Sequence, residues 1–183
     1  MIRKIKQELR LAMNGVASTQ MREAGLQYHV NFGVELPRLK QMAEEFGQDA
    51  DVASQLWRED VRESKILACM MMPTEVFGAD LCDLWVSQMP NAEIAEMASL
   101  LLFSRLPYAL AASFVWMASD VPLRQVCGFM TIAHLVRRGV VLAPREAKEM
   151  CDQCHAGLLQ AEDAVKMAAR RALAAYENTG CVQ

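Results

Sequence analysis

The chain has 183 residues, of which 53% are apolar, 22% charged and 7% aromatic, with only nine Gly and six Pro. The chain has enough apolar residues to form a buried core, and it contains little Gly or Pro. This composition excludes a disordered, collagenous or low-complexity chain. The length is that of one domain, and a net charge of −3 argues against a strongly cationic nucleic-acid binder.

The amino end predicts neither an export signal nor a membrane anchor. Residues 1–6 are basic, but Glu8 and Arg10 interrupt the next segment, and no apolar signal core appears. The longest stretch without a charged residue, 106–119, has fourteen residues, whereas about 20 are needed to cross a bilayer. We therefore expect no contact with a membrane and a cytoplasmic protein.

Apolar residues recur at helical spacing along the chain. The pattern is clear over residues 81–89 and 159–172, where they return every three or four positions. Ala, Leu, Met, Glu, Gln and Arg dominate, and all of them favour helices. The one strand-like stretch, 139–142, is four residues long and is predicted to be a connector. Almost the whole chain is therefore predicted to be helical.

Five of the six prolines mark the predicted helix boundaries, because proline is tolerated in the first turn of a helix and breaks it later. They stand at 73, 90, 107, 122 and 144, separated by 17, 17, 15 and 22 residues. That pitch fits one short helix and a turn, so a pair of antiparallel helices repeats about every 34 to 44 residues. This predicts an all-α, HEAT/armadillo-like solenoid of antiparallel helix pairs, forming one domain over residues 1–183.

Charge is unevenly distributed along the chain. Residues 1–40 carry a net +4, residues 41–120 a net −9, and residues 121–183 a net +2. Stacked helices could bring the two basic ends onto one face and give it a positive field. Ordinary solvated helix faces are the alternative explanation.

The cysteines and histidines give no clear site. The six cysteines (69, 82, 127, 151, 154 and 181) are expected to be reduced, because a chain of this length needs no disulfides. Cys151, Cys154 and His155 match the pattern of covalent haem attachment, but they lie within a helical run. His29 and His134 are more typical of a core or groove than of a catalyst. We expect no cofactor and no metal site.

Several short motifs resemble the bacterial alkylpurine DNA glycosylase family (AlkD-like). They are Gly33-Val34-Glu35-Leu36-Pro37-Arg38-Leu39, then Leu56-Trp57, then Arg62-Glu63, and later Trp116-Met117-Ala118-Ser119-Asp120 followed by Leu123-Arg124. The resemblance covers about residues 25–177. It implies stacked helices that grip the DNA backbone and a hydrolase that cleaves the glycosidic bond of alkylated purines. In that chemistry a carboxylate supports the cation that develops on the sugar.

Carrying the family's functional positions onto this sequence gives three residues. Glu96 takes the place of the catalytic carboxylate, with Ala92 where the family has an aromatic residue, and Arg124 takes the place of the phosphate-binding arginine. Arg171 stands where the family has a second Trp. The alternatives are a solvated carboxylate in the first turn of a helix for Glu96 and a helix-stabilising arginine for Arg124.

Three functions are compatible with these residues. The first is a glycosylase that uses Glu96, and the second is a non-catalytic relative that binds duplex DNA. In the second, Arg124, Arg137, Arg138, Arg170 and Arg171 contact phosphates. The third is a scaffold that binds a protein partner, because stacked helices offer a groove and the acidic middle suits a basic partner.

Overall fold

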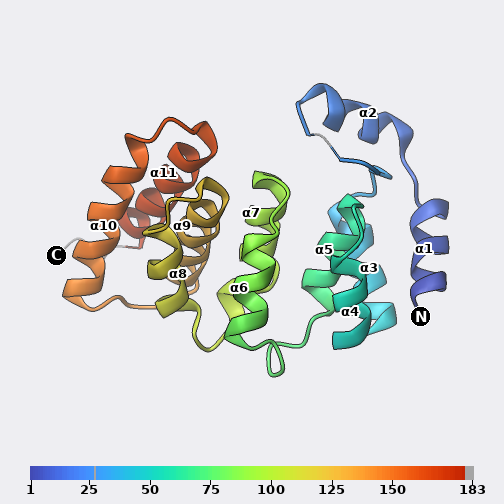
Figure 1. Cartoon of the computed structure of the whole chain (residues 1–183), viewed down its shortest axis with the longest axis horizontal. Coiled ribbons are helices and arrows are strands. Elements are labelled where there is room, and N and C mark those ends of the chain that lie inside the picture. The colour runs from blue at the N-terminus through green and yellow to red at the C-terminus, as the bar shows by residue number, and fades with distance from the viewer. Residues whose placement is uncertain (27, 180–183) are drawn as a thin grey trace. The chain divides into compact units, whose positions relative to one another are not determined.

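The computed structural model describes residues 1–26 and 28–179, whose regular elements are all helices. They form two compact units, residues 1–77 (unit 1) and 78–183 (unit 2). Unit 1 contains α1 (Ile2–Leu11), α2 (Gly15–Glu23), α3 (Leu36–Phe46), α4 (Ala50–Trp57) and α5 (Arg62–Met71) (Figure 1). Unit 2 contains α6 (Ala79–Ser87), α7 (Ala92–Leu101), the 3-10 helix η1 (Phe103–Arg105), α8 (Ala109–Met117), α9 (Pro122–Arg137), α10 (Pro144–Leu158) and α11 (Asp163–Asn178).

The prediction of an all-α chain is confirmed for the described residues, where an isolated bridge between Val30 and Val61 is the one β-type pairing. Within the same residues, no helix is both long and apolar enough to traverse a bilayer. The expectation that residues 1–183 form one domain stays a prediction.

Two of the five prolines lie in the first turn of a helix, as predicted, and the other three lie in the segment before one. Pro122 and Pro144 are the first residues of α9 and α10. Pro90 and Pro107 stand two residues before α7 and α8, and Pro73 stands six residues before α6. Residues 139–142 join α9 to α10 without helix or strand, which confirms the predicted connector.

Side-chain caps fix three further helix starts. Asn14, Asp49 and Asn91 each accept a hydrogen bond from the backbone N–H three residues later, at 3.1, 2.9 and 3.0 Å. Such caps satisfy a backbone donor that has no partner within the helix and typically stabilise it by about 1 kcal/mol. The boundaries of α2, α4 and α7 are therefore set by their own local sequence.

Unit 1 is organised around α5, which is buried along nearly its whole length. The Glu63 side chain is fully buried and accepts hydrogen bonds from the backbone N–H groups of Phe32 and Val34, at 3.1 and 3.2 Å. Two residues on, Lys65 donates to the carbonyl of Trp57 at 2.7 Å, and its ammonium lies 4.7 Å from the centre of that ring. These polar contacts fasten the 30–34 segment and the end of α4 to α5.

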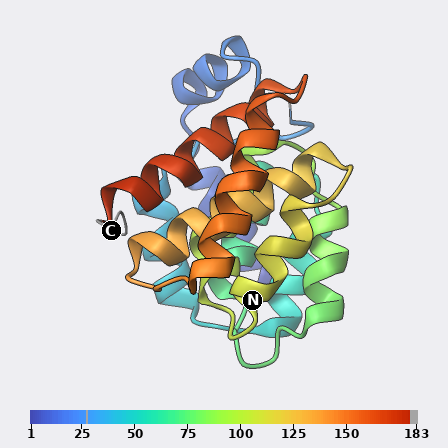
Figure 2. The same ribbon diagram turned by 90° about the vertical axis from the view of Figure 1, so that its left-hand side faces the viewer.

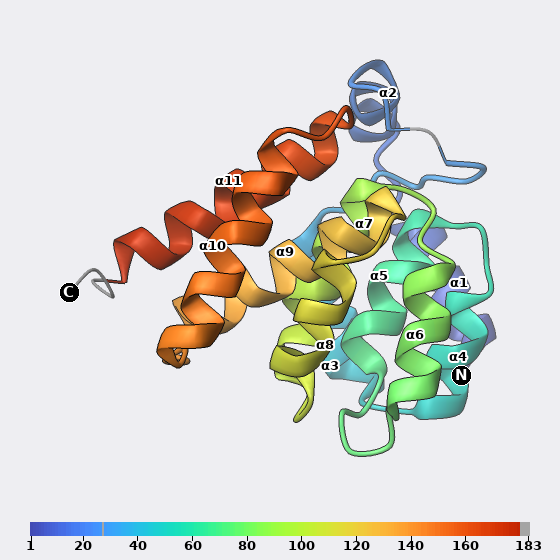
Figure 3. The same ribbon diagram turned by 60° about the vertical axis from the view of Figure 1, so that its left-hand side comes forward.

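Unit 2 is organised around α9, which packs against α6, α7, α8 and α11. Figures 1 and 3 show α7 and α11 on opposite sides of α9, and Figure 2 shows α10 and α11 side by side. A Cβ at Gly128 would lie 2.5 Å from the backbone N of Met117 and 2.8 Å from the carbonyl of Ser113. Only glycine therefore permits the close approach of α8 and α9.

Candidate functional site

Glu96 lies on α7 and forms an ion pair with Arg171 on α11. The carboxylate Oε2 is 2.6 Å from the guanidinium Nη1, and the two side chains are 29% and 42% exposed. Because α7 begins at Ala92, Glu96 lies beyond the first turn, and Glu93 is the acidic residue of that turn. The alternative of a solvated first-turn carboxylate is therefore wrong, since Glu96 is in the second turn and is held by an arginine.

Arg124 lies in the first turn of α9, and its guanidinium contacts Asp83 of α6. Its Nη2 donates to Asp83 Oδ1 at 2.7 Å, and the same oxygen accepts from the buried indole N–H of Trp116 on α8 at 3.0 Å. One carboxylate oxygen thus joins three helices. This is the contact expected of a helix-stabilising arginine, and sequence reasoning did not select Asp83.

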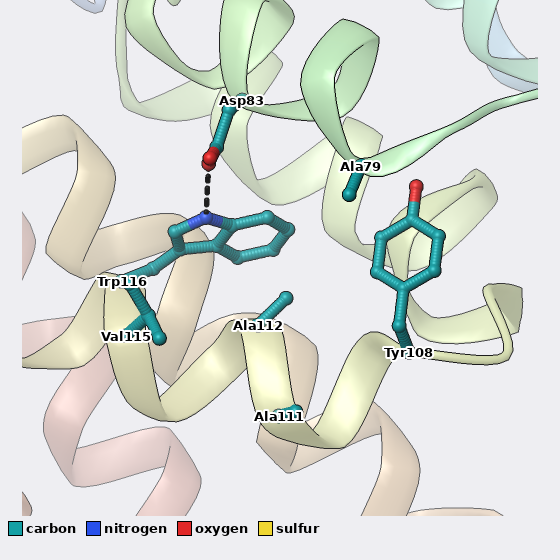
Figure 4. A pocket seen from close by; sticks show the side chains of 7 residues that line it. All are labelled: Ala79, Asp83, Tyr108, Ala111, Ala112, Val115 and Trp116. Atoms are coloured by element: carbon teal, nitrogen blue, oxygen red, sulfur yellow. Dashed lines mark hydrogen bonds between the residues drawn. The ribbon is translucent and has the colours of Figure 1, made fainter.

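A cavity of about 250 Å³ lies beside the Asp83–Trp116 hydrogen bond, between α6 and α8 (Figure 4). Its lining is mostly apolar, from three alanines, Val115 and the rings of Tyr108 and Trp116. Next to it, burial raises the pKa of the Cys82 thiol to about 12, partly offset by a hydrogen bond with Tyr108. A thiol that stays protonated is not a nucleophile at neutral pH, so this cavity holds no activated cysteine.

The other predicted DNA-binding arginines differ in whether their guanidinium groups already make a contact. Arg137 and Arg170 are exposed and make no ion pair among the described residues. Arg138 donates to the carbonyl and the hydroxyl of Ser104, at 2.9 and 3.2 Å. Of the five predicted arginines, Arg137 and Arg170 therefore have guanidinium groups that can meet a phosphate without breaking an existing contact.

His134 lies one turn before Arg137 and is half-buried. Burial, together with the positive charges of Arg137 and Arg138, lowers its pKa to about 4. The imidazole is therefore neutral at pH 7 and adds no charge to this end of α9. The expectation of a core or groove histidine fits His134, whereas His29 is exposed.

The Cys151, Cys154 and His155 motif lies in the middle of α10. Both thiols are free, and burial raises the pKa of each, that of Cys154 to about 12. Among residues 1–26 and 28–179 no three His, Cys, Asp or Glu side chains are grouped so that they could hold a metal ion. The five described cysteines form no disulfide, as expected, and Cys181 lies outside the described residues.

A family model described as "DNA alkylation repair enzyme" matches residues 5–179. Among solved structures, one described as "A new family of proteins related to the HEAT-like repeat DNA glycosylases with affinity for branched DNA structures" aligns with a TM-score of 0.90 at 14% identity. The alignment covers 98% of this chain and 77% of that one. A comparison with curated proteins finds no match.

The structural likeness confirms the predicted HEAT-like fold, and the residues matched span nearly the whole sequence. The resemblance drawn from the short motifs is confirmed as well, because they lie within the matched range. The chain belongs to the DNA alkylation repair enzyme family.

Proposed function

We propose that this protein binds DNA through backbone phosphates, prefers branched structures, and does not release bases. The Glu96–Arg171 ion pair is the observation that carries the proposal. A glycosylase of this kind needs a carboxylate whose negative charge stabilises a developing sugar cation. At 2.6 Å from a guanidinium, Glu96 belongs to a pair with no net charge.

The neighbouring positions support the same conclusion. The resemblance implies aromatic rings at 92 and 171, where this chain has Ala and Arg. A cation over an aromatic face gains about 0.5–2 kcal/mol, and neither Ala92 nor Arg171, which is already paired with Glu96, offers such a face. The site therefore lacks the rings that would attract the alkylated base. It also lacks an uncompensated carboxylate that would stabilise the transition state of base release.

Phosphate binding has better support. Arg137 and Arg170 present exposed guanidinium groups in unit 2 that make no ion pair within residues 1–26 and 28–179, whereas the charge of Arg171 is neutralised by Glu96. Arginine binds phosphate oxygens through two parallel hydrogen bonds. The preference for branched DNA is inferred from the structural relative, which is described as having affinity for such structures.

Base release tests the enzymatic part. An oligonucleotide that contains N7-methylguanine is incubated with the parent protein and with Glu96→Gln, and free base is measured against the spontaneous rate. We expect both proteins to stay at the spontaneous rate. Release by the parent that disappears in Glu96→Gln would overturn the proposal in favour of a glycosylase.

Salt dependence tests the binding part. Affinity for a junction and for a duplex is measured by fluorescence anisotropy at several salt concentrations. Each phosphate contact contributes about 0.9 to the slope of log affinity against log salt on duplex DNA, so Arg137→Gln/Arg170→Gln lowers the slope by about 1.8. The matched control Arg22→Gln/Lys40→Gln removes two exposed charges of unit 1 and leaves the slope unchanged.

Glu96→Gln gives a test in the opposite direction. Removing the carboxylate frees Arg171, so the slope steepens by about 0.9 and affinity rises. Glu177→Gln, which also removes one exposed negative charge from unit 2, is the control and changes the slope little. An affinity for DNA that does not change with salt concentration, or no binding of DNA at low salt, would instead favour a scaffold for a protein partner.

A further inference from the structure

A basic stripe on α1 lines an open hollow in unit 1, which we call the α1 hollow. It has a volume of about 560 Å³ and is lined by Arg3, Lys6 and Arg10, with Gln7 and Leu11 beside them. The three basic residues are spaced by three and four positions, which places them on one face of the helix. Arg3 and Arg10 make no ion pair among the described residues.

A second cavity, the α1 cavity, adjoins the hollow and shares Lys6 and Arg10 with it. It measures about 190 Å³, the liquid volume of about six waters. Phe32, Val30 and Val61 supply much of its apolar wall. The combination is thus a cationic hollow that opens beside a small apolar cavity with an aromatic ring.

Polar side chains also line the α1 cavity. Glu59 Oε1 is 2.6 Å from the Lys6 ammonium, and its Oε2 accepts a hydrogen bond from the Ser64 hydroxyl at 2.9 Å. The Glu59 side chain is 21% exposed. These groups fix the position of Lys6, whereas Arg3 and Arg10 have no ion pair in the part of the chain that the structure describes.

The walls of the α1 cavity are fixed by hydrogen bonds from α5. The backbone N–H of Phe32 donates to the buried Glu63 carboxylate at 3.1 Å, and the N–H of Arg62 donates to the carbonyl of Val30 at 3.1 Å. Val30 also forms the bridge with Val61. The cavity is therefore formed before any ligand arrives, which lowers the entropic cost of binding.

We propose that this region of unit 1 binds one unpaired nucleotide of a nucleic-acid strand, with its base in the α1 cavity and its phosphates in the α1 hollow. The inference rests on the proposed function, for which it names a second site, made of residues of unit 1 and not of the arginines of α9 and α11. Sequence-independent binding of single strands combines a basic groove with an aromatic ring on which a base stacks. The shared residues Lys6 and Arg10 place those two features side by side.

This site would explain a preference for branched DNA. A base within a duplex is already stacked and paired, so its entry into a cavity costs the energy of unstacking. Unpaired nucleotides at a junction or a flap carry little of that cost. The α1 cavity thus distinguishes unpaired from paired nucleotides and does not distinguish one base sequence from another.

The test uses the full-length protein and three labelled probes: an oligothymidylate of about twelve nucleotides, a duplex of the same length, and a junction with a single-stranded arm. Arg3→Gln/Arg10→Gln should lower the salt slope for the oligothymidylate by about 1.4, at about 0.7 per phosphate on a single strand. The control Arg22→Gln/Lys40→Gln carries the same change of charge and should leave that slope unchanged.

Phe32→Leu tests the cavity itself, because it keeps an apolar side chain and removes the ring face. We expect about fivefold weaker binding of the oligothymidylate, the lower end of the range for loss of stacking, with the salt slope unchanged. Binding of the duplex should not change. Urea unfolding of each variant verifies that it is folded, and the arginine variants, altered only on the surface, test the site even if Phe32→Leu unfolds.

The outcomes separate this inference from the proposed function. If the parent binds no DNA, the proposed function fails. If the parent binds and Arg137→Gln/Arg170→Gln weakens it while Arg3→Gln/Arg10→Gln has no effect, the inference alone is overturned. Equal losses on duplex and single strand, or binding of phosphatidylserine vesicles through the same two arginines, would also overturn it.

Discussion

Asp83→Ala should destabilise unit 2 more than its exposed position suggests. The substitution removes the oxygen that accepts from the Trp116 indole and from Arg124, at 3.0 and 2.7 Å. The indole is buried, and a buried donor left without a partner costs about 1–3 kcal/mol. The Arg124 pair is partly exposed and adds about 0–1 kcal/mol, so we expect a loss of about 2–3 kcal/mol.

Urea unfolding measures this effect. With a denaturant dependence of about 2 kcal/mol per molar, the midpoint should fall by about 1 M at an unchanged slope. Asp83→Asn keeps an acceptor oxygen for the indole and loses only the charge, so it should cost about 1 kcal/mol. Combined with Arg124→Gln, Asp83→Ala should show a coupling of less than about 1 kcal/mol. An Asp83→Ala protein within about 0.5 kcal/mol of the parent would refute the three-helix role.

Three further substitutions test other contacts. Glu63→Gln should lower the free energy of unfolding in urea by about 3 kcal/mol, because it leaves the buried Arg62 guanidinium without its counterion and replaces one of the two oxygens that accept from backbone N–H groups; a loss below about 1 kcal/mol would contradict this. Lys65→Met should cost about 1–2 kcal/mol through the lost hydrogen bond and the lost contact with the Trp57 ring, and a more stable variant would show that desolvating the ammonium outweighs both. Because the pKa of His134 is lowered in the folded protein, its contribution to the free energy of unfolding is complete above pH 6.5. That contribution is lost as the pH falls toward 4, because the unfolded chain takes up the proton first. After allowance for solvent screening this is about 1 kcal/mol, and His134→Gln should flatten the stability curve in that window; an unchanged curve would refute the shift.

The helices could be predicted from the sequence because their signals are local. Spacing of apolar residues gives the helical period, and proline or a capping side chain sets the start of most helices. Two tryptophans lie near helix ends, with Trp57 the last residue of α4 and Trp116 the second last of α8. Each of these features depends on residues only a few positions apart.

The contacts of the candidate site could not be predicted in the same way, because they join distant residues. Asp83 and Arg124 are 41 positions apart, and nothing near either of them in the sequence indicates the other. The same holds for Glu96 and Arg171, which lie on helices separated by α9. Family resemblance selected Glu96, Arg124 and Arg171 as positions but could not show that the first and last neutralise each other. The site in unit 1 was missed because Phe32 and the α1 stripe carry no motif.

The Glu96–Arg171 pair gives a simple criterion for sorting relatives of this chain. Neither partner can be replaced alone without leaving a half-exposed charge that has lost its counterion, so the two positions should change together. Relatives with a carboxylate on the helix equivalent to α7 and an aromatic residue on the one equivalent to α11 have the combination that the resemblance associates with base excision. Relatives with an acid and an arginine at the two positions should not excise bases. The residue types at these two positions would then distinguish the two groups.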